Sequence, residues 1–286
     1  MDCRSVSQAE WIAREVGEEE VYRRTGLRVA ITFTATKLLW LKENQPDIYE
    51  KTWVFLQPKE YINYLITGVA CSDPSLASRT MMFNINSLRW DEDLISTYGL
   101  SSDKLPKVKK SSDIIGYLKD DMAKLLGIGK SIPVVNGGGD RPCEALGAGV
   151  IKEGILGEST GTATNVMASI DKPILDVKMR ILCSCHVLPG KWLLEGGTTP
   201  TGAILRWFRD ELGSDEVKKA NELGVDPYVI IDEEASKVPP CSDGLILLPF
   251  FMGAKATHWN PYLRGVLIGL TLGHRKAHIA LSLIHI

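Results

Sequence analysis

The sequence has no excess of charge of one sign, since 33 Lys and Arg stand against 35 Asp and Glu and the net charge is −2. It also lacks an apolar run near the roughly 18 residues that a membrane span needs, and its first residues lack the apolar core of a signal peptide. These absences predict a cytoplasmic protein without a membrane or nucleic-acid partner. One basic cluster, Lys104, Lys107, Lys109 and Lys110, has prolines and serines around it and is interpreted as a solvated loop.

The six cysteines show no paired spacing of the kind found in disulfide frameworks or zinc sites. Cys183-Ser-Cys185-His186 is the one segment that suggests a metal cluster. It lies within the apolar run Ile181–Leu188, which favours a strand, and alternate residues of a strand share a face. Cys183 and Cys185 are therefore expected to point one way and His186 the other, and no metal site is predicted.

The sequence has 286 residues, of which 44% are hydrophobic and 24% are charged. This length and composition indicate a globular protein of about two domains. Apolar spacing and caps predict helices, and short apolar runs predict buried strands. The expected helices are Ser7–Val16, Lys37–Asn44, Pro58–Gly68, Ser112–Leu126, Thr201–Leu212 and residues 215–236; the expected buried strands are Trp53–Leu56, Ile132–Val135 and Leu245–Phe250.

From Gly149 onward, shorter apolar runs alternate with Gly, Ser and Thr, which is typical of strands paired through turns. These runs are Ile155–Ser159, Thr164–Ser169, Ile181–Leu188 and Trp192–Glu195. The change predicts two α/β domains, residues 1–149 and 150–280, with a boundary within about ten residues of Gly149.

The segment Asn136-Gly-Gly-Gly-Asp140 follows the expected strand Ile132–Val135. Glycines allow a ligand to approach the backbone, and open α/β sheets hold ligands at the carboxyl ends of their strands. Asp140 is thus a candidate catalytic carboxylate. Because Arg141-Pro142 follows, Asp140 is equally well read as a helix N-cap, and both roles can hold together.

A second polar turn, Gly157-Glu-Ser-Thr-Gly-Thr-Ala-Thr164, lies between two expected strands. Its backbone N–H groups and hydroxyls suit a phosphate group. No Lys follows its glycines, so it is not a P-loop, and a plain hairpin remains the alternative.

Taken together, these segments resemble the FGGY carbohydrate kinases from residue 1 to about residue 280. The similar segments are Thr34–Asn44, Lys59–Gly68, then Asp73, Ser75, Ala77, Ser78 and Trp90, the Gly-Gly-Asp140 turn, Ser159–Thr162, Cys185–Trp192, Gly202–Asp210 and Arg264–Leu270. Within the family, Cys185–Trp192 and Gly202–Asp210 are most similar to xylulokinases.

The resemblance implies two actin-like ATPase (ribonuclease H-like) domains, both incomplete, with sugar bound mainly by the first and ATP mainly by the second. Asp140 would be the general base, and Arg141 and Thr32 would contact the sugar. ATP and Mg²⁺ are the implied cofactors, with no metal ligand assigned in the chain. The implied nucleotide-side residues are Gly161, Thr162, Gly202 and Arg206.

The resemblance implies phosphorylation of a ketopentose such as D-xylulose. Arg141 stands where glycerol kinases have Gln and many xylulokinases have Asn or Gln, so glycerol, ribulose or gluconate remain alternatives. A non-catalytic sugar- or nucleotide-binding protein of the actin-like fold is the alternative from another class. The expected partner is a small sugar, and a homodimer is kept as a hypothesis.

Both ends of the sequence carry expectations of their own. Met1–Arg4 resembles a W-x-D-x-R stretch that other family members reach only after a phosphate turn and a sugar-contacting segment. Residues 281–286 match the translation of a transposase adaptor used in preparing DNA libraries, so a non-native tail that packs without pattern is expected there. A chain lacking such segments is expected to be poorly stable and inactive by itself.

Overall fold

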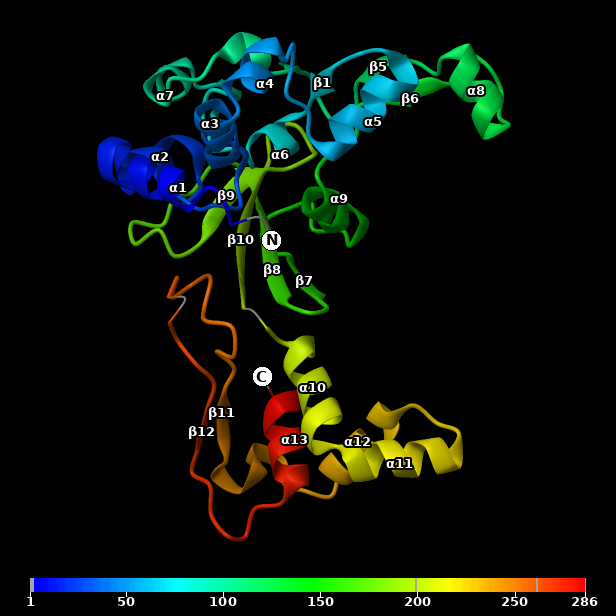
Figure 1. Cartoon of the computed structure of the whole chain (residues 1–286). Helices are drawn as coiled ribbons and strands as arrows, with labels where there is room; N and C mark the ends of the chain where they lie inside the picture. The colour runs from blue at the N-terminus through cyan, green and yellow to red at the C-terminus, as the bar shows by residue number, and fades with distance from the viewer. Residues whose placement is uncertain (1–2, 199, 261, 286) are drawn as a thin grey trace. The chain divides into compact units, whose positions relative to one another are not determined.

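The computed structural model describes residues 3–198, 200–260 and 262–285 (Figure 1). The chain divides into two compact units, of which unit 1 comprises Met1–Gly157 and Met167–Glu195, and unit 2 comprises Glu158–Val166 and Gly196–Ile286. The chain passes between the units within β7 (Leu156–Thr160), β8 (Thr164–Ile170) and β10 (Trp192–Thr198). The expectation for Met1–Arg4 rests partly on residues 1–2, which lie outside the described residues.

Unit 1 opens with helices and continues with short strands among further helices. Its helical elements are α1 (Val6–Trp11), η1 (Ile12–Gly17), α2 (Glu18–Thr25), α3 (Thr34–Asn44), α4 (Pro46–Lys51), α5 (Pro58–Thr67), α6 (Pro74–Ala77), α7 (Glu92–Thr97), η2 (Ser102–Lys104), α8 (Asp120–Leu126) and α9 (Asp140–Gly147). Its strands before β7 are β1 (Cys71–Ser72), β2 (Phe83–Asn84), β3 (Arg89–Trp90), β4 (Lys107–Val108), β5 (Ile114–Tyr117) and β6 (Pro133–Val135).

Capping explains the bounds of the helix α5. Pro58 occupies its first turn, and the backbone N–H of Gln57 donates to Glu60 Oε2 at 2.7 Å, closing a capping box. Gly68, at φ 80°, ends the helix in the left-handed region, where a glycine costs least. The helices predicted at Lys37–Asn44 and Pro58–Gly68 are confirmed by α3 and α5.

Three expectations for unit 1 are wrong. Residues 53–56 form no strand, and Trp53 is 67% exposed. The segment Ser112–Leu126 is helical only from Asp120, because residues 114–117 pair with β6 as the strand β5. The strand predicted at Ile132–Val135 exists as β6 but is not buried, since it has β5 as its single partner and Val135 is 50% exposed.

The four strands expected after Gly149 are confirmed, and they form one sheet in the order β7-β8-β10-β9. β9 (Leu182–Cys185) pairs antiparallel with β10, with Cys185 opposite Trp192. Both strands contribute to the apolar core of unit 1, which also holds side chains from α6 and β2. That core comprises Ala77, Phe83, Ile85, Ile170, Cys183, Cys185 and Trp192.

Unit 2 is mainly helical after β10. Its elements are α10 (Gly202–Trp207), η3 (Phe208–Leu212), α11 (Ser214–Leu223), α12 (Pro227–Ala235), η4 (Pro240–Gly244), β11 (Ile246–Leu248), β12 (Val266–Ile268) and α13 (Lys276–Ile284). β11 and β12 pair antiparallel. A separate core holds Ile204, Phe208, Ile231, Ala235, Leu247, Ala280 and Leu283. No helix in the described ranges is long and apolar enough to cross a membrane.

The expectation that residues 281–286 pack without pattern is wrong for residues 281–284, which complete α13. Leu283 is 7% exposed in the core of unit 2. Ser282 Oγ donates to the Leu245 carbonyl at 2.9 Å and accepts from the N–H of Leu247 at 3.1 Å. The origin of these six residues stays a prediction, which resequencing of the locus tests.

The division of the chain into these two units differs from the predicted division at a single boundary near Gly149. Val150, just past that point, is buried with Ala145 of α9 and with Met167 and Leu193 of the sheet. These contacts keep residues 150–157 and 167–195 with unit 1. Two domains split at residue 149 therefore stay a prediction.

Candidate active site

Asp140 is the first residue of α9, directly after the loop that leaves β6. Its side chain is exposed, and its Oδ1 accepts the N–H of Arg141 at 2.9 Å. The N-cap of α9 is Gly139, so the reading of Asp140 as the cap is wrong by one position. A carboxylate in the first turn of a helix is stabilised by the helix dipole and remains open to a ligand.

A buried carboxylate, Asp73, fixes the loop that precedes Asp140. It accepts from Lys59 Nζ at 3.0 Å, from Ser111 Oγ at 2.8 Å and from the N–H and hydroxyl of Ser75. Ser75 Oγ in turn accepts the N–H of Gly139 at 2.9 Å. Because Asp73 is fully buried, its lone pairs must be satisfied by protein donors, and the result is a fixed backbone one residue before Asp140.

Asn136 fixes the start of the same loop. Its Nδ2 donates to the Ser72 carbonyl at 2.8 Å, and its own carbonyl accepts from Asn63 Nδ2 at 2.8 Å. At Gly138 there is no room for a side chain, since a Cβ would lie 2.2 Å from Val187 Cγ1. Gly138 thus serves close packing of the loop, whereas Gly137 supplies a positive φ of 74°.

Arg141 reaches a second buried carboxylate, Glu195, at the unit 1 end of β10. Glu195 Oε2 accepts from Arg141 at 3.2 Å, and Oε1 accepts from Arg79 at 3.0 Å and from Ser184 Oγ at 2.6 Å. Burial by itself would raise the pKa of Glu195, but Arg79, Ser184 and Arg141 outweigh it and hold that pKa below its usual value. Glu195 is therefore a charged carboxylate inside unit 1.

Thr32 lies in the turn before α3, and its carbonyl accepts from Lys37 Nζ at 3.1 Å. The ring of the next residue, Phe33, lies 5.4 Å from the guanidinium of Arg79. One series of contacts thus runs from Phe33 through Arg79 and Glu195 to Arg141. The role of Thr32 toward the sugar stays a prediction.

In unit 2 the structure brings together the two nucleotide-side segments proposed from the sequence. The N–H of Gly202 donates to the Gly161 carbonyl at 3.1 Å, and that of Thr201 to the Thr162 carbonyl at 3.0 Å. A Cβ at Gly202 would lie 2.3 Å from the Gly161 oxygen, so only glycine permits this approach. Thr164 Oγ1 adds a bond to Thr201 Oγ1 at 2.9 Å.

Arg206 is exposed one helical turn further along α10. No ion pair of Arg206 is recorded within the described ranges. Asp140 and the Gly161–Thr162 turn belong to different units. A common cleft for the two stays a prediction, as do the nucleotide-side roles.

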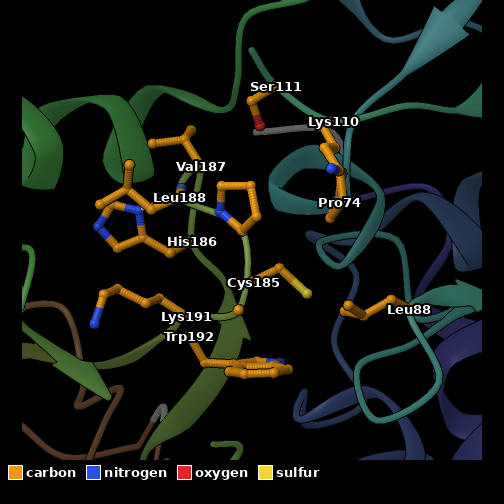
Figure 2. Close-up of a pocket in the computed structure, with 12 residues that line it drawn as sticks. Pro74, Leu88, Lys110, Ser111, Cys185, His186, Val187, Leu188, Lys191 and Trp192 are labelled. Carbon is orange, nitrogen blue, oxygen red and sulfur yellow. Dashed lines mark hydrogen bonds between the residues drawn. The ribbon is translucent and has the colours of Figure 1, made fainter. Parts of the chain in front are cut away.

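A pocket in unit 1 is lined by the turn from Cys185 to Trp192, with Pro74, Leu88, Lys110 and Ser111 around it (Figure 2). Cys185 and His186 point to opposite sides, as strand alternation predicts. The N–H of Leu188 donates to His186 Nδ1 at 3.0 Å, so the proton sits on Nε2, which lies 3.1 Å from the Val150 carbonyl. None of the predicted site residues lines this pocket.

Cys183 and Cys185 are buried thiols of β9. Burial raises the pKa of each to about 12, so both are protonated in the folded chain. Within residues 3–198, 200–260 and 262–285 no three His, Cys, Asp or Glu side chains gather closely enough to hold a metal ion.

Comparison with known proteins gives the family. The model of the FGGY family of carbohydrate kinases, N-terminal domain, matches residues 1–147, and that of the C-terminal domain matches residues 158–285. The chain belongs to the FGGY family of carbohydrate kinases, and its mixed α/β fold is that of the family.

Among curated relatives, the gluconokinase of Bacillus subtilis is 36% identical over 97% of this chain and 54% of that protein. The autoinducer-2 kinase of Escherichia coli K12 is 33% identical over 87% of this chain and 46% of that protein. Among solved structures, ligand-bound xylulose kinase from Lactobacillus acidophilus matches with a TM-score of 0.89 and 26% identity, over 99% of this chain and 56% of that one. The chain thus spans about half the length of the relatives it matches.

Sequence reasoning missed Glu195 and Arg79 as parts of the site. Glu195 ends the apolar run that was read as the strand Trp192–Glu195, and an ionisable group at such a place is the signal that could have singled it out. Asp73 and Ser75 appeared only as parts of a family pattern, without a role in placing Asp140.

Proposed function

We propose that the protein transfers the γ-phosphate of ATP to a hydroxyl group of a sugar, with Asp140 as the general base. The observation that carries this proposal is the placement of Asp140: an exposed carboxylate at the start of α9 on a backbone that buried hydrogen bonds fix. Membership of the FGGY family supports the same class of reaction.

In this mechanism Asp140 accepts the proton of the attacking hydroxyl as its oxygen forms a bond to the γ-phosphorus and the bond to ADP breaks. The proton ends on the Asp140 carboxylate, and ADP and the sugar phosphate leave. A positioned general base contributes roughly 100- to 10,000-fold to such a step. Oδ1 accepts the N–H of Arg141, and no hydrogen bond to Oδ2 is recorded among the described residues, so Oδ2 is the more open of the two oxygens.

Gly161, Thr162, Gly202 and Arg206 would hold the nucleotide. The N–H groups of Gly161 and Gly202 already donate to backbone carbonyls, so the exposed hydroxyl of Thr162 and the cation of Arg206 are the groups that would contact a phosphate. Mg²⁺ bound to the phosphates would neutralise charge that develops during transfer. Since the described part of the chain has no three-ligand cluster, the ion is expected to enter with the nucleotide.

A ketopentose such as D-xylulose is the first proposed substrate. It rests on the likeness of Cys185–Trp192 and Gly202–Asp210 to xylulokinases and on the match to the xylulose kinase of Lactobacillus acidophilus. Cys185–Trp192 joins β9 to β10, and Gly202–Asp210 forms α10 and the start of η3.

Gluconate is a second candidate, favoured by Arg141. The side chain of Arg141 is 36% exposed and donates a single recorded bond to Glu195, so other N–H groups of its guanidinium remain for a substrate carboxylate beside Asp140. The 36% identity to the gluconokinase of Bacillus subtilis supports the same choice.

The test is a substrate panel with the protein expressed from its complete reading frame. D-xylulose, D-ribulose, D-gluconate and glycerol are each supplied with MgATP, and ADP release and sugar phosphate are both measured. Turnover of D-xylulose or of D-gluconate identifies the substrate, and turnover of glycerol alone contradicts both choices. Binding of a sugar without any ADP release would favour the non-catalytic alternative.

A further inference from the structure

Glu195 connects the first turn of α9, through Arg141, to β10 in unit 1. Its side chain is 2% exposed, and it is the last residue of β10 that belongs to unit 1. The chain continues directly into Gly196 and Gly197, so the carboxylate stands where the strand leaves the unit. A buried charge at such a place requires strong compensation.

The compensation comes from two guanidinium groups, one on each carboxylate oxygen. Arg79 lies 3.0 Å from Oε1 and Arg141 lies 3.2 Å from Oε2. Two cations against one anion leave a net charge of +1, and Arg141 is the more exposed of the two, at 36% against 23% for Arg79. Of the two guanidinium groups, that of Arg141 is therefore the one more accessible to an anionic or polar ligand.

Arg141 is also tied to Asp140 through the backbone, because its own N–H donates to Asp140 Oδ1 at 2.9 Å. Holding the guanidinium on Glu195 therefore limits both the side chain of Arg141 and the rotation of the first turn of α9. Arg79, which lies over the ring of Phe33, keeps the other oxygen of Glu195 occupied, so the carboxylate cannot turn away.

We propose that Glu195 is a positioning residue, which holds Arg141 so that its remaining N–H groups bind the sugar substrate next to Asp140. This inference rests on the proposed function. Glu195 itself is too deeply buried to touch the substrate and acts through Arg141. The expected signature is therefore a loss of sugar affinity that depends on the presence of Arg141.

The experiment is a double-mutant cycle in the protein from its complete reading frame, with the best sugar of the panel. Glu195→Gln removes the charge while keeping the shape, and Arg141→Gln removes the cation. Each single variant should raise the KM for the sugar about 10- to 100-fold, because a charged hydrogen bond to the substrate is lost or misplaced, with kcat changed far less. The double variant should be no worse than Arg141→Gln.

Asp91→Asn is the matched control. Asp91 is also a buried carboxylate paired with a guanidinium, Arg24 at 2.9 Å, and it caps α7 by accepting the N–H of Leu94 at 3.1 Å. It has no recorded contact with α9 among the described residues. Its replacement should lower the melting temperature without changing the KM.

Additive effects of Glu195→Gln and Arg141→Gln would overturn the proposal, as would a Glu195→Gln variant that loses stability at unchanged KM. If Glu195→Gln does not fold, Glu195→Asp keeps the charge but withdraws it from Arg141, and its KM should still rise several-fold. Should the wild type release no ADP, the sugar Kd from calorimetry replaces KM. A wild type that neither binds nor phosphorylates any sugar overturns both the proposed function and this inference.

Discussion

Asp140 combines exposure with a fixed backbone, and the next residue, Arg141, carries a guanidinium. Asp140→Asn keeps an oxygen that accepts the Arg141 N–H but removes the group that takes a proton. We expect turnover by the complete protein to fall at least about 100-fold, with the unfolding free energy little changed. Steady-state kinetics and thermal unfolding of the two proteins test this. A variant that unfolds while its folded remainder turns over normally would show that Asp140 is structural.

His186 makes two hydrogen bonds, accepting the Leu188 N–H at Nδ1 and donating from Nε2 to the Val150 carbonyl. Burial, aided by Lys191, lowers the pKa of His186 below its usual value of about 6.5, although the Val150 bond opposes this. The unfolded chain therefore binds a proton at higher pH than the folded one does.

The unfolding free energy should fall as the pH drops below about 6.5 toward the lowered pKa of His186. In His186→Gln this part of the pH dependence should be missing, and in a variant of the exposed His258 it should persist. Urea unfolding at several pH values between about 5 and 7.5 measures the difference. Equal slopes for the wild type and His186→Gln would contradict the assignment.

At the scale of elements, the sequence correctly predicted the helices and strands whose bounds depend on neighbouring residues. Pro58, Glu60 and Gly68 define α5 through caps that involve only neighbouring residues. The alternating runs after Gly149 gave the four strands of the sheet in the same way. Sequence could not decide between helix and strand at Ile114–Tyr117, because a short apolar run fits both and the partner strand, β6, decides.

In the candidate site, too, features marked by neighbouring residues were predicted, and features that depend on distant partners were not. Asp140 and the Gly161–Thr162 turn were found because glycines mark them, and Gly202 was found through its family pattern. Glu195 was missed, because its ion pairs with Arg79 and Arg141, which are distant in sequence, form only in the fold.

Two glycines, Gly138 in the turn before α9 and Gly147 inside α9, should respond oppositely to replacement by alanine. A Cβ at Gly138 would lie 2.2 Å from Val187 Cγ1 and 2.9 Å from Ser75 Oγ, whereas one at Gly147, inside α9, would meet nothing within 4 Å. Gly138→Ala should therefore destabilise unit 1 by about 1–3 kcal/mol, and Gly147→Ala should stabilise it by up to about 1 kcal/mol. Urea unfolding of both variants checks this, and equal shifts of the same sign would show that the loop is not closely packed.

At the scale of the whole molecule, the two units have separate cores, one around Phe83 and Trp192 and one around Phe208 and Leu283. Leu283→Ala should cost about 2–5 kcal/mol and lower amide protection in α10, α12 and α13 while leaving β9 unchanged. Ile284→Ala, at a neighbouring position that is 44% exposed, is the control and should change little. Hydrogen exchange measures both. If the two variants behaved alike, residues 281–284 would not pack as α13 shows.

The passage of the chain between the units within β7, β8 and β10 also sets an order of events during synthesis. Unit 1 needs residues 167–195 to complete its sheet and to supply Glu195 to Arg79 and Arg141. A nascent chain that ends at Gly157 therefore has the core around Phe83 still open and has two arginines without their carboxylate. Unit 1 can close only after residues 158–166 of unit 2 have also been translated, whereas residues 196–286 are not needed for that step.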